Sequence, residues 1–232
     1  MNNPLTDPGP PFPECKAVVF DLDGTLVDSY GAITECFNHA RTELGEAPLS
    51  LAQVRGMVGH GLEDLMEDAV GRRRMPQAVR LFRERYDLIC EERTTLLPGV
   101  AAAVTALAAR GLSQGVATNK PTRFAVRILR VLGLMPPLTA VLGSGGGIPA
   151  KPDPHMLLRV LEELAVPPAA ALYVGDMTID VETARNAGVR VWVLPTGSCS
   201  REQLAAASPD HIFASMEQLP DLLAGAAQGP AA

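Results

Sequence analysis

The chain has 232 residues, enough for one α/β core and a modest second module. Hydrophobic residues make up 47% and charged residues 20% of it, which is typical of a globular protein rather than a disordered one. The formal net charge is −6 and no long run carries one sign, so we expect no nucleic acid as a main partner.

Other compositional features exclude further classes of protein. The four cysteines are far apart and form no CxxC or Cys/His cluster, which argues against structural zinc and a disulfide framework. No segment approaches ~20 uninterrupted apolar residues, so no membrane span is expected. The proline-rich start lacks the basic and apolar regions of a secretory signal. We therefore expect a cytoplasmic protein with a disordered leader at 1–14 and a frayed tail at 225–232.

Short apolar runs, most of them followed by a helical pattern, recur along most of the chain. The expected strands are residues 17–20, 114–118, 140–143, 171–174 and 191–194. The expected helices are residues 101–110, 122–132, 154–164 and 179–187. Continuous apolar strands that alternate with helices indicate a parallel sheet buried on both faces. The expected fold is a doubly wound, Rossmann-like α/β sheet, which binds ligands at the carboxyl ends of its strands.

One stretch, residues 29–97, interrupts this alternation. It contains no good strand, and its helical patterns cover residues 30–44, 51–58, 62–70 and 76–92. We therefore expect a helical cap at 29–97, inserted into a core formed by 15–28 and 98–224. The apolar helices of this insert are compatible with a monomer or a homodimer.

Acidic residues follow two of the expected strands. Asp21 and Asp23 come directly after the first strand, and Asp176 and Asp180 follow the strand at 171–174. Carboxylates at the end of a buried strand are costly unless they pair with a cation or share a proton. Taken singly, Asp23 and Gly24 could form only a turn, and Asp176 could cap a helix. A helix cap at Asp176 leaves Asp180 unexplained.

Two further clues stand at strand ends. Thr118 and Asn119 precede an expected helix start, where hydroxyl, amide and backbone N–H groups can hold a phosphate, although such residues are commonly plain N-caps. Lys151 precedes another helix and could equally be a surface residue. Together with the acidic residues they suit a hard cation such as Mg²⁺ and a phosphoryl group.

These residues resemble the haloacid dehalogenase-like hydrolase superfamily over roughly residues 16–219. Its four motifs occur in order: DLDGT from Asp21, the threonine at 118, the lysine at 151 and GDxxxD with Asp176. The helical insert matches the family's small cap in position and size. The stretches VATNKP and VRGMVGHG look most like phosphoglycolate phosphatases.

The resemblance implies a role for each catalytic residue. Asp21 would be the nucleophile that forms an aspartyl-phosphate, and Asp23 the general acid and base. Thr118 and Asn119 would hydrogen-bond the phosphoryl oxygens, and Lys151 would neutralise charge on Asp21 and phosphate.

The resemblance also implies a Mg²⁺ site. Its ligands would be the Asp21 carboxylate, the Asp23 backbone carbonyl and Asp176, with Asp180 as an outer or occasional ligand. The implied partner is a small phosphate ester.

Besides Asn119, four residues are candidates for substrate binding. Gly24 and Thr25 belong to the first motif. The planar fork of Arg55 suits a substrate carboxylate or second phosphate, though an exposed helix residue is an equal alternative. His60, in a cap loop, could contact substrate or lie at the surface. Ser29 is expected only to cap the first helix of the insert.

The hypothesis is a Mg²⁺-dependent phosphatase for a small metabolite ester such as 2-phosphoglycolate. A sugar-phosphate mutase shares the four motifs and is one alternative, and a non-enzymatic phosphate-binding module is another. The imine-forming phosphonate-cleaving branch uses a cap lysine, but the lysines here are at positions 16, 120 and 151. Dehalogenases lack the second carboxylate, which this chain has as Asp23.

Overall fold

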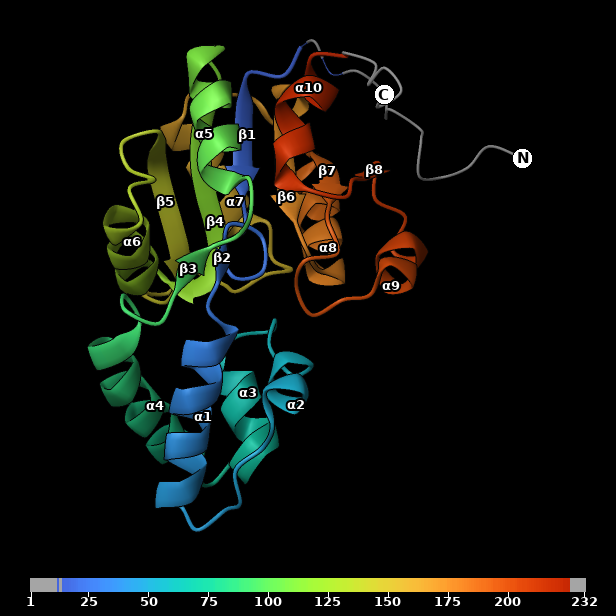
Figure 1. The fold of residues 1–232 in the computed structure, drawn as a ribbon. Coiled ribbons are helices and arrows are strands. Elements are labelled where there is room, and N and C mark those ends of the chain that lie inside the picture. The colour runs from blue at the N-terminus through green and yellow to red at the C-terminus, as the bar shows by residue number, and fades with distance from the viewer. Residues whose placement is uncertain (1–11, 13, 226–232) are drawn as a thin grey trace, which may run out of the picture.

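The computed structural model describes residue 12 and residues 14–225. The expected leader and tail, 1–14 and 225–232, fall almost wholly outside these residues. A six-stranded sheet forms the core, with all neighbouring strands parallel (Figure 1). In spatial order its strands are β5 Leu138–Ser144, β4 Ser113–Pro121, β1 Ala17–Phe20, β6 Ala171–Gly175, β7 Arg190–Val193 and β8 His211–Ile212. The expected parallel α/β sheet is confirmed.

The central strand β1 determines where a ligand can bind. It pairs with β4 on one side and β6 on the other, so the order of the strands reverses beside it. Phe20 at its end is in register with Val116 and Val174. The segments that follow these strands therefore emerge at one level, at the switch point where such sheets bind ligands.

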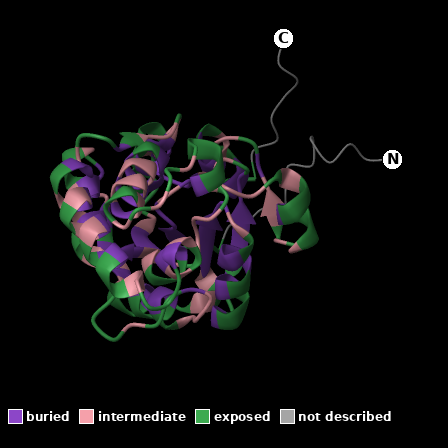
Figure 2. Ribbon diagram, turned by 90° about the horizontal axis from the view of Figure 1, so that it is seen from below, coloured by how far each residue is buried: buried purple, intermediate pink, exposed green. Residues whose placement is uncertain are grey.

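Both faces of the sheet are covered by helices, which explains the continuously apolar strands (Figures 1 and 2). One face packs against α5 Val100–Ala109, α6 Thr122–Val131 and α10 Leu219–Leu223. The other packs against α7 His155–Glu163, α8 Thr178–Ala187 and α9 Arg201–Ala206. Successive side chains of β1 point to opposite faces of the sheet. Val18 and Phe20 pack with the helices of the first face, and Ala17 and Val19 pack with those of the second.

The helical cap contains four helices and lies below the sheet in Figure 1. They are α1 Tyr30–Glu43, α2 Leu51–Arg55, α3 Leu62–Val70 and α4 Met75–Ile89. The cap is entered from β2 Val27–Asp28 and left through β3 Thr95–Leu96, which pair antiparallel. The prediction of no strand within 29–97 is wrong at β3, because a two-residue strand is too short to show a period. Helix α2 ends at Arg55 rather than near residue 58, and Gly56 caps it.

Short elements in the second half of the chain escaped sequence prediction. These are β8, α9, α10 and the 3₁₀ helices Pro168–Ala170 and Met216–Gln218. Strand β4 also continues to Pro121, with an irregularity after Thr118. The helix predicted at 122–132 is confirmed as α6, which begins at Thr122, and Thr118 and Asn119 lie at the end of the strand before it.

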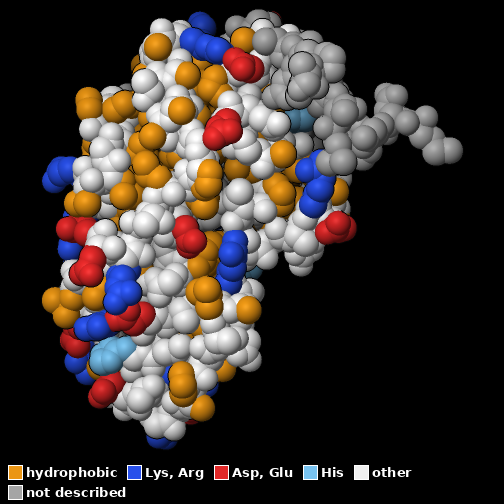
Figure 3. All heavy atoms as spheres, in the orientation of Figure 1, with side chains coloured by type: hydrophobic (Ala, Val, Ile, Leu, Met, Phe, Trp, Pro, Cys, Tyr) orange, Lys and Arg blue, Asp and Glu red, His pale blue; other side chains and the backbone are white. Residues whose placement is uncertain are grey.

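The distribution of surface charge agrees with the sequence, in which no long run carries one sign. Charged side chains of both signs are interspersed on the face shown in Figure 3, most densely over the cap. No helix among the described residues combines the length and the apolar character needed to cross a membrane. The four cysteines are unpaired.

Candidate active site

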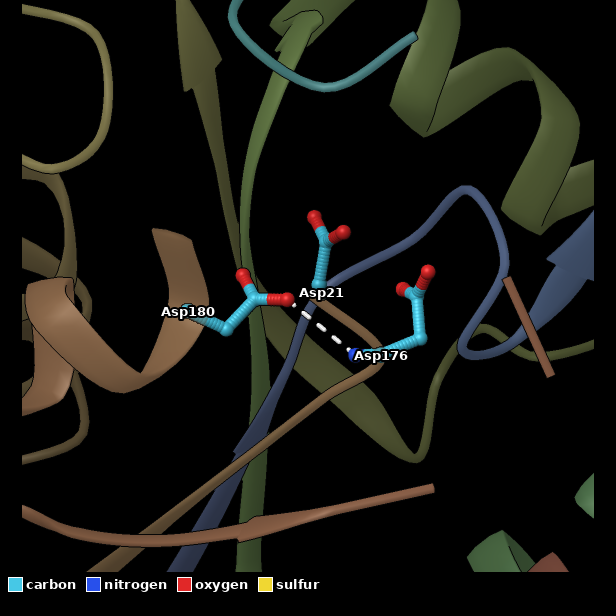
Figure 4. A group of neighbouring side chains, drawn as sticks. All are labelled: Asp21, Asp176 and Asp180. Carbon is cyan, nitrogen blue, oxygen red and sulfur yellow. Dashed lines mark hydrogen bonds between the residues drawn. The ribbon is translucent and has the colours of Figure 1, made fainter. Parts of the chain in front are cut away.

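Three buried aspartates meet at the carboxyl edge of the sheet. Asp21 follows β1, Asp176 follows β6, and Asp180 lies in the first turn of α8. Each offers a carboxylate oxygen, and these oxygens lie within 4.8 Å of one another (Figure 4). All three residues are at most 5% exposed. The separation is compatible with ligands of a single ion, for which metal–oxygen lengths are about 2.0–2.6 Å.

Local hydrogen bonds hold Asp176 and Asp180 in place. Asp180 Oδ2 accepts from the backbone N–H groups of Asp176 (3.1 Å) and Met177 (3.0 Å), and so caps the start of α8. Thr25 Oγ1 donates to Asp176 Oδ1 at 2.7 Å. Gly24 has a φ of +88°, and a Cβ there would lie 2.5 Å from Asp176 Oδ2. Gly24 and Thr25, predicted to bind substrate, are not among the residues that line the cavity described below.

Lys151 partly compensates the acidic cluster. Its buried Nζ lies 2.8 Å from Asp21 Oδ1 and 2.7 Å from Asp180 Oδ1. Three carboxylates against this one ammonium leave two negative charges unbalanced. Accordingly, burial and the neighbouring carboxylates raise the pKa of Asp21 to about 6, although Lys151 opposes the shift. The same causes raise the pKa of Asp176 well above its ordinary range.

The donor set fits a divalent cation. Asp176 Oδ2 is buried and has no hydrogen-bond partner, and Asp21 Oδ1 has only its ion pair with Lys151. A buried carboxylate oxygen without a partner is costly, and a cation beside it would remove that cost. The ligands are all oxygen atoms, which hard cations prefer.

Asp23 lies beside this cluster and has partners of its own. Lys120 Nζ is 2.9 Å from Asp23 Oδ1 and 2.8 Å from Oδ2. Burial works to lower the pKa of Lys120, but the ion pair outweighs it and holds that pKa above its ordinary value. Lys120 also lies over the ring of Tyr86, 4.8 Å from its centroid. Sequence reasoning missed Lys120 as a site residue, although its place in VATNKP put it at a strand end.

Ser29 has a different role from the one predicted. It occupies the N-cap position of α1, but its hydroxyl makes no capping bond and donates instead to Asp23 Oδ1. The carboxylate of Asp28 accepts from the N–H of Tyr30 at 3.1 Å. Ser29 therefore helps to orient Asp23.

A cavity opens over these groups, between core and cap. Its core side is lined by Asp21, Asp23, Thr118, Asn119, Lys120 and Lys151. Its cap side is lined chiefly by the apolar residues Ile33, Val58, Leu62, Leu65 and Phe82. Counted with the open solvent at its mouth, the cavity has a volume of about 700 Å³.

Comparison with known families identifies this arrangement. The model of the family described as haloacid dehalogenase-like hydrolase matches residues 18–194. The chain belongs to this family. The match spans the aspartates, both buried lysines and the whole cap.

Individual relatives narrow the class of hydrolase. Over 219 residues the chain is 39% identical to the phosphoglycolate phosphatase of Rhodospirillum rubrum, covering 90% of each. It is 34% identical to a plasmid phosphoglycolate phosphatase of Cupriavidus necator, covering 94% of this chain and 97% of the relative. The chain is therefore an enzyme of the phosphoric monoester hydrolase type.

Solved structures agree on the fold. A crystal structure of a predicted phosphoglycolate phosphatase from Haemophilus somnus superposes with a TM-score of 0.83 at 28% identity, covering 89% of this chain and 96% of that one. A haloacid dehalogenase-like hydrolase from Bacteroides fragilis gives a TM-score of 0.84 at 25% identity, covering 88% and 99%.

In this hydrolase the Asn119 side chain joins two loops. Its Oδ1 accepts from the N–H of Lys151 at 2.7 Å, and its Nδ2 donates to the carbonyl of Gly59 at 3.0 Å. Asn119 also lines the cavity, and its predicted contact with phosphoryl oxygens stays a prediction. Thr118 is buried and lines the cavity, as its predicted role requires.

The two predicted substrate residues of the cap, Arg55 and His60, are not among the lining residues of the hydrolase cavity. The Arg55 guanidinium donates to the carbonyls of Thr196 (2.6 Å) and Gly197 (2.9 Å), and lies over the ring of Tyr30. Arg55 thus fastens the cap to the loop after β7. His60 is exposed.

Proposed function

We propose that this hydrolase is a Mg²⁺-dependent phosphatase, which hydrolyses a small phosphate monoester through a phosphorylated Asp21. The observation that carries the proposal is the charge imbalance of the buried site. Asp21, Asp176 and Asp180 share one ammonium, that of Lys151, beneath a cavity open to a small molecule. A divalent cation would balance the excess negative charge of this site, and the site could then bind a phosphate oxyanion.

In the first step, an Asp21 carboxylate oxygen attacks phosphorus while the bond from phosphorus to the leaving oxygen breaks. Asp23 gives a proton to that oxygen, so that an alcohol departs. In the second step, Asp23 takes a proton from water, whose oxygen attacks phosphorus and releases Asp21 and inorganic phosphate. Two easier displacements replace one difficult displacement.

The surrounding residues prepare these steps. Lys151, 2.8 Å from Asp21 Oδ1, holds the nucleophile and balances charge that develops on the phosphoryl group. Lys120 and Ser29 orient the Asp23 carboxyl. Thr118, which is buried and lines the cavity, would donate a hydrogen bond to a phosphoryl oxygen.

Mg²⁺ would be held by the carboxylates of Asp21 and Asp176 and by the backbone carbonyl of Asp23. Asp180 would support the site from outside, because its oxygens already accept from Lys151 and from backbone N–H groups. The bound cation would supply Lewis-acid stabilisation of charge on the phosphoryl oxygens.

The proposed substrate is 2-phosphoglycolate or a similar small ester, on the basis of the relatives named above. The sugar-phosphate mutase alternative gains no support from the cavity. A sugar presents many hydroxyls, and the cap side meets them with Ile33, Leu65 and Phe82. A non-enzymatic binding module is disfavoured by the complete set of acids.

A cytoplasmic location and a monomeric or homodimeric state are also part of the proposal. Size-exclusion chromatography with light scattering tests the second of these directly.

The function is tested with purified protein, Mg²⁺ and 2-phosphoglycolate, with phosphate release as the measurement. We expect turnover by the wild-type protein and a loss of at least about 1,000-fold in Asp21→Asn, because the amide cannot form the covalent intermediate. Circular dichroism should show that the variant is folded. Continued turnover by folded Asp21→Asn would remove Asp21 as the nucleophile.

A further inference from the structure

A substrate whose leaving group carries a carboxylate needs a cationic side chain nearby to bind that carboxylate, and few cationic side chains line the cavity. This point rests on the proposed function. Among the described residues that line the cavity, the cationic side chains are Lys120 and Lys151. Lys151 is engaged by Asp21 and Asp180 at the phosphoryl end. Lys16, the third lysine of the chain, is exposed at the start of β1.

Lys120 is built into the cavity wall. It is 8% exposed, and its ammonium contacts both oxygens of Asp23. An ammonium has three N–H donors, so two such contacts leave it capacity for a further acceptor. The aromatic residues Tyr86 and Phe124 line the same cavity, and Tyr86 lies beneath the ammonium. A charge held in such apolar surroundings interacts strongly with an added anion.

A purely structural role explains this lysine poorly. A buried ion pair contributes little net stability, because desolvation offsets most of the attraction. The Asp23 carboxyl could be oriented by Ser29 alone, without a second buried charge. The placement of Lys120 therefore points to the substrate.

The position of the leaving group indicates which part of the substrate Lys120 meets. Asp23 must lie within hydrogen-bond reach of the leaving oxygen to give it a proton. In 2-phosphoglycolate a single methylene separates that oxygen from the carboxylate. The carboxylate is thereby confined to the neighbourhood of Asp23, where Lys120 is the cation.

We propose that Lys120 is the specificity-determining residue that binds the carboxylate of the substrate. It thereby selects phosphorylated 2-hydroxy acids over phosphate esters whose leaving group carries no charge. Lys120, which contacts both oxygens of Asp23, is shared with the substrate carboxylate in the complex. Selection then comes from the core of the enzyme, not from the cap.

The test compares 2-phosphoglycolate with ethyl phosphate, which has a methyl group in place of the carboxylate. The variant is Lys120→Met, with Lys16→Met as the matched surface control and Lys120→Arg as the charge-retaining variant. Because a hydrogen bond to a charged group is lost, kcat/KM for 2-phosphoglycolate should fall about 10- to 100-fold more than that for ethyl phosphate. The excess loss should lie mainly in KM. Lys120→Arg should recover part of the preference, and Lys16→Met should match the wild type.

A second measurement is used if an ester is hydrolysed too slowly for its kcat/KM to be determined. With p-nitrophenyl phosphate as reporter, the inhibition constants of 2-phosphoglycolate and ethyl phosphate give the same ratio without turnover of either ester. Lys120→Gln and thermal unfolding by circular dichroism serve if Lys120→Met does not fold.

Equal losses on both esters would overturn the inference, since Lys120 would then act only through Asp23. Full activity of Lys120→Met on both esters would overturn it as well. Either result leaves the proposed phosphatase intact, provided that the wild type hydrolyses 2-phosphoglycolate. Failure of the wild type on all three esters would instead reject the proposed function.

Discussion

The two walls of the cavity are built by different chemistry. On the core side, the charged groups are held by ion pairs: buried Asp21 pairs with buried Lys151, and half-buried Asp23 pairs with Lys120. On the cap side, Leu65 and Phe82 are buried apolar groups held by packing. The core wall therefore fixes directions and charge, while the cap wall supplies shape and excludes water. Changes to the two walls should differ in size and in kind.

Among the residues that support Asp21, the largest effect is expected from Lys151→Met on the core wall. The change leaves three neighbouring carboxylates without a cation of the protein's own. We expect kcat/KM to fall about 100- to 1,000-fold, as for loss of an oxyanion-stabilising group. In chelator the free energy of unfolding should fall by about 3–5 kcal/mol, as when one partner of a buried ion pair is removed. Phosphate release and urea unfolding measure the two effects, with Lys16→Met as control. Unchanged activity and stability would contradict the assigned role.

Asp176→Asn should have the opposite effect on stability. Burial, together with Asp180 and Asp21, raises the pKa of Asp176, and burial raises that of Asp21 to about 6. The folded state therefore holds protons that the unfolded state has released. Without metal, the free energy of unfolding should fall as pH rises from about 4, the unfolded pKa, through 6 and above.

The amide at position 176 does not titrate, so its curve should be flatter. At pH 8 in chelator we expect Asp176→Asn to be more stable than the wild type by about 1–3 kcal/mol, the scale of an unsatisfied buried polar group. Urea unfolding at pH 5 and pH 8 gives both slopes. A variant less stable than the wild type at pH 8 would show that the buried carboxylate is not strained.

The smallest effect is expected at the attachment of the cap. Arg55→Ala removes the donors to the carbonyls of Thr196 and Gly197 but no group that lines the cavity. We expect kcat/KM to fall about 3- to 10-fold, by equal factors for charged and neutral esters, because a looser cap excludes water less well. Arg159→Ala, at an exposed position on α7, is the matched control. A loss confined to 2-phosphoglycolate would return Arg55 to the role of a substrate residue.

The acidic cluster could be predicted from sequence because its logic is topological. Asp21 and Asp176 directly follow buried parallel strands, whose carboxyl ends meet at one edge whatever the details of packing. The spacing from Asp176 to Asp180 then needs only one helical turn. Most strands could be predicted from short apolar runs, and most helices from the helical spacing of apolar residues, because both are local features of the sequence.

Other contacts join residues that are far apart in the sequence, and no local sequence pattern predicts them. Lys120 meets Asp23 across 97 positions of sequence, and nothing local in VATNKP specifies that partner. Arg55 binds backbone carbonyls, which any residue types could supply. Ser29 stands at an N-cap position, so the local explanation hid its bond to Asp23.

The central claim is that Asp21 and Asp176, supported by Asp180, form one site for a divalent cation. Isothermal titration calorimetry of Mg²⁺ into the wild-type protein and into Asp176→Asn tests it most directly. We expect one binding event per chain in the wild type and at least about 10-fold weaker binding in the variant, since one anionic ligand is lost. Absence of Mg²⁺ binding by the wild type, or equal affinity in Asp176→Asn, would contradict it.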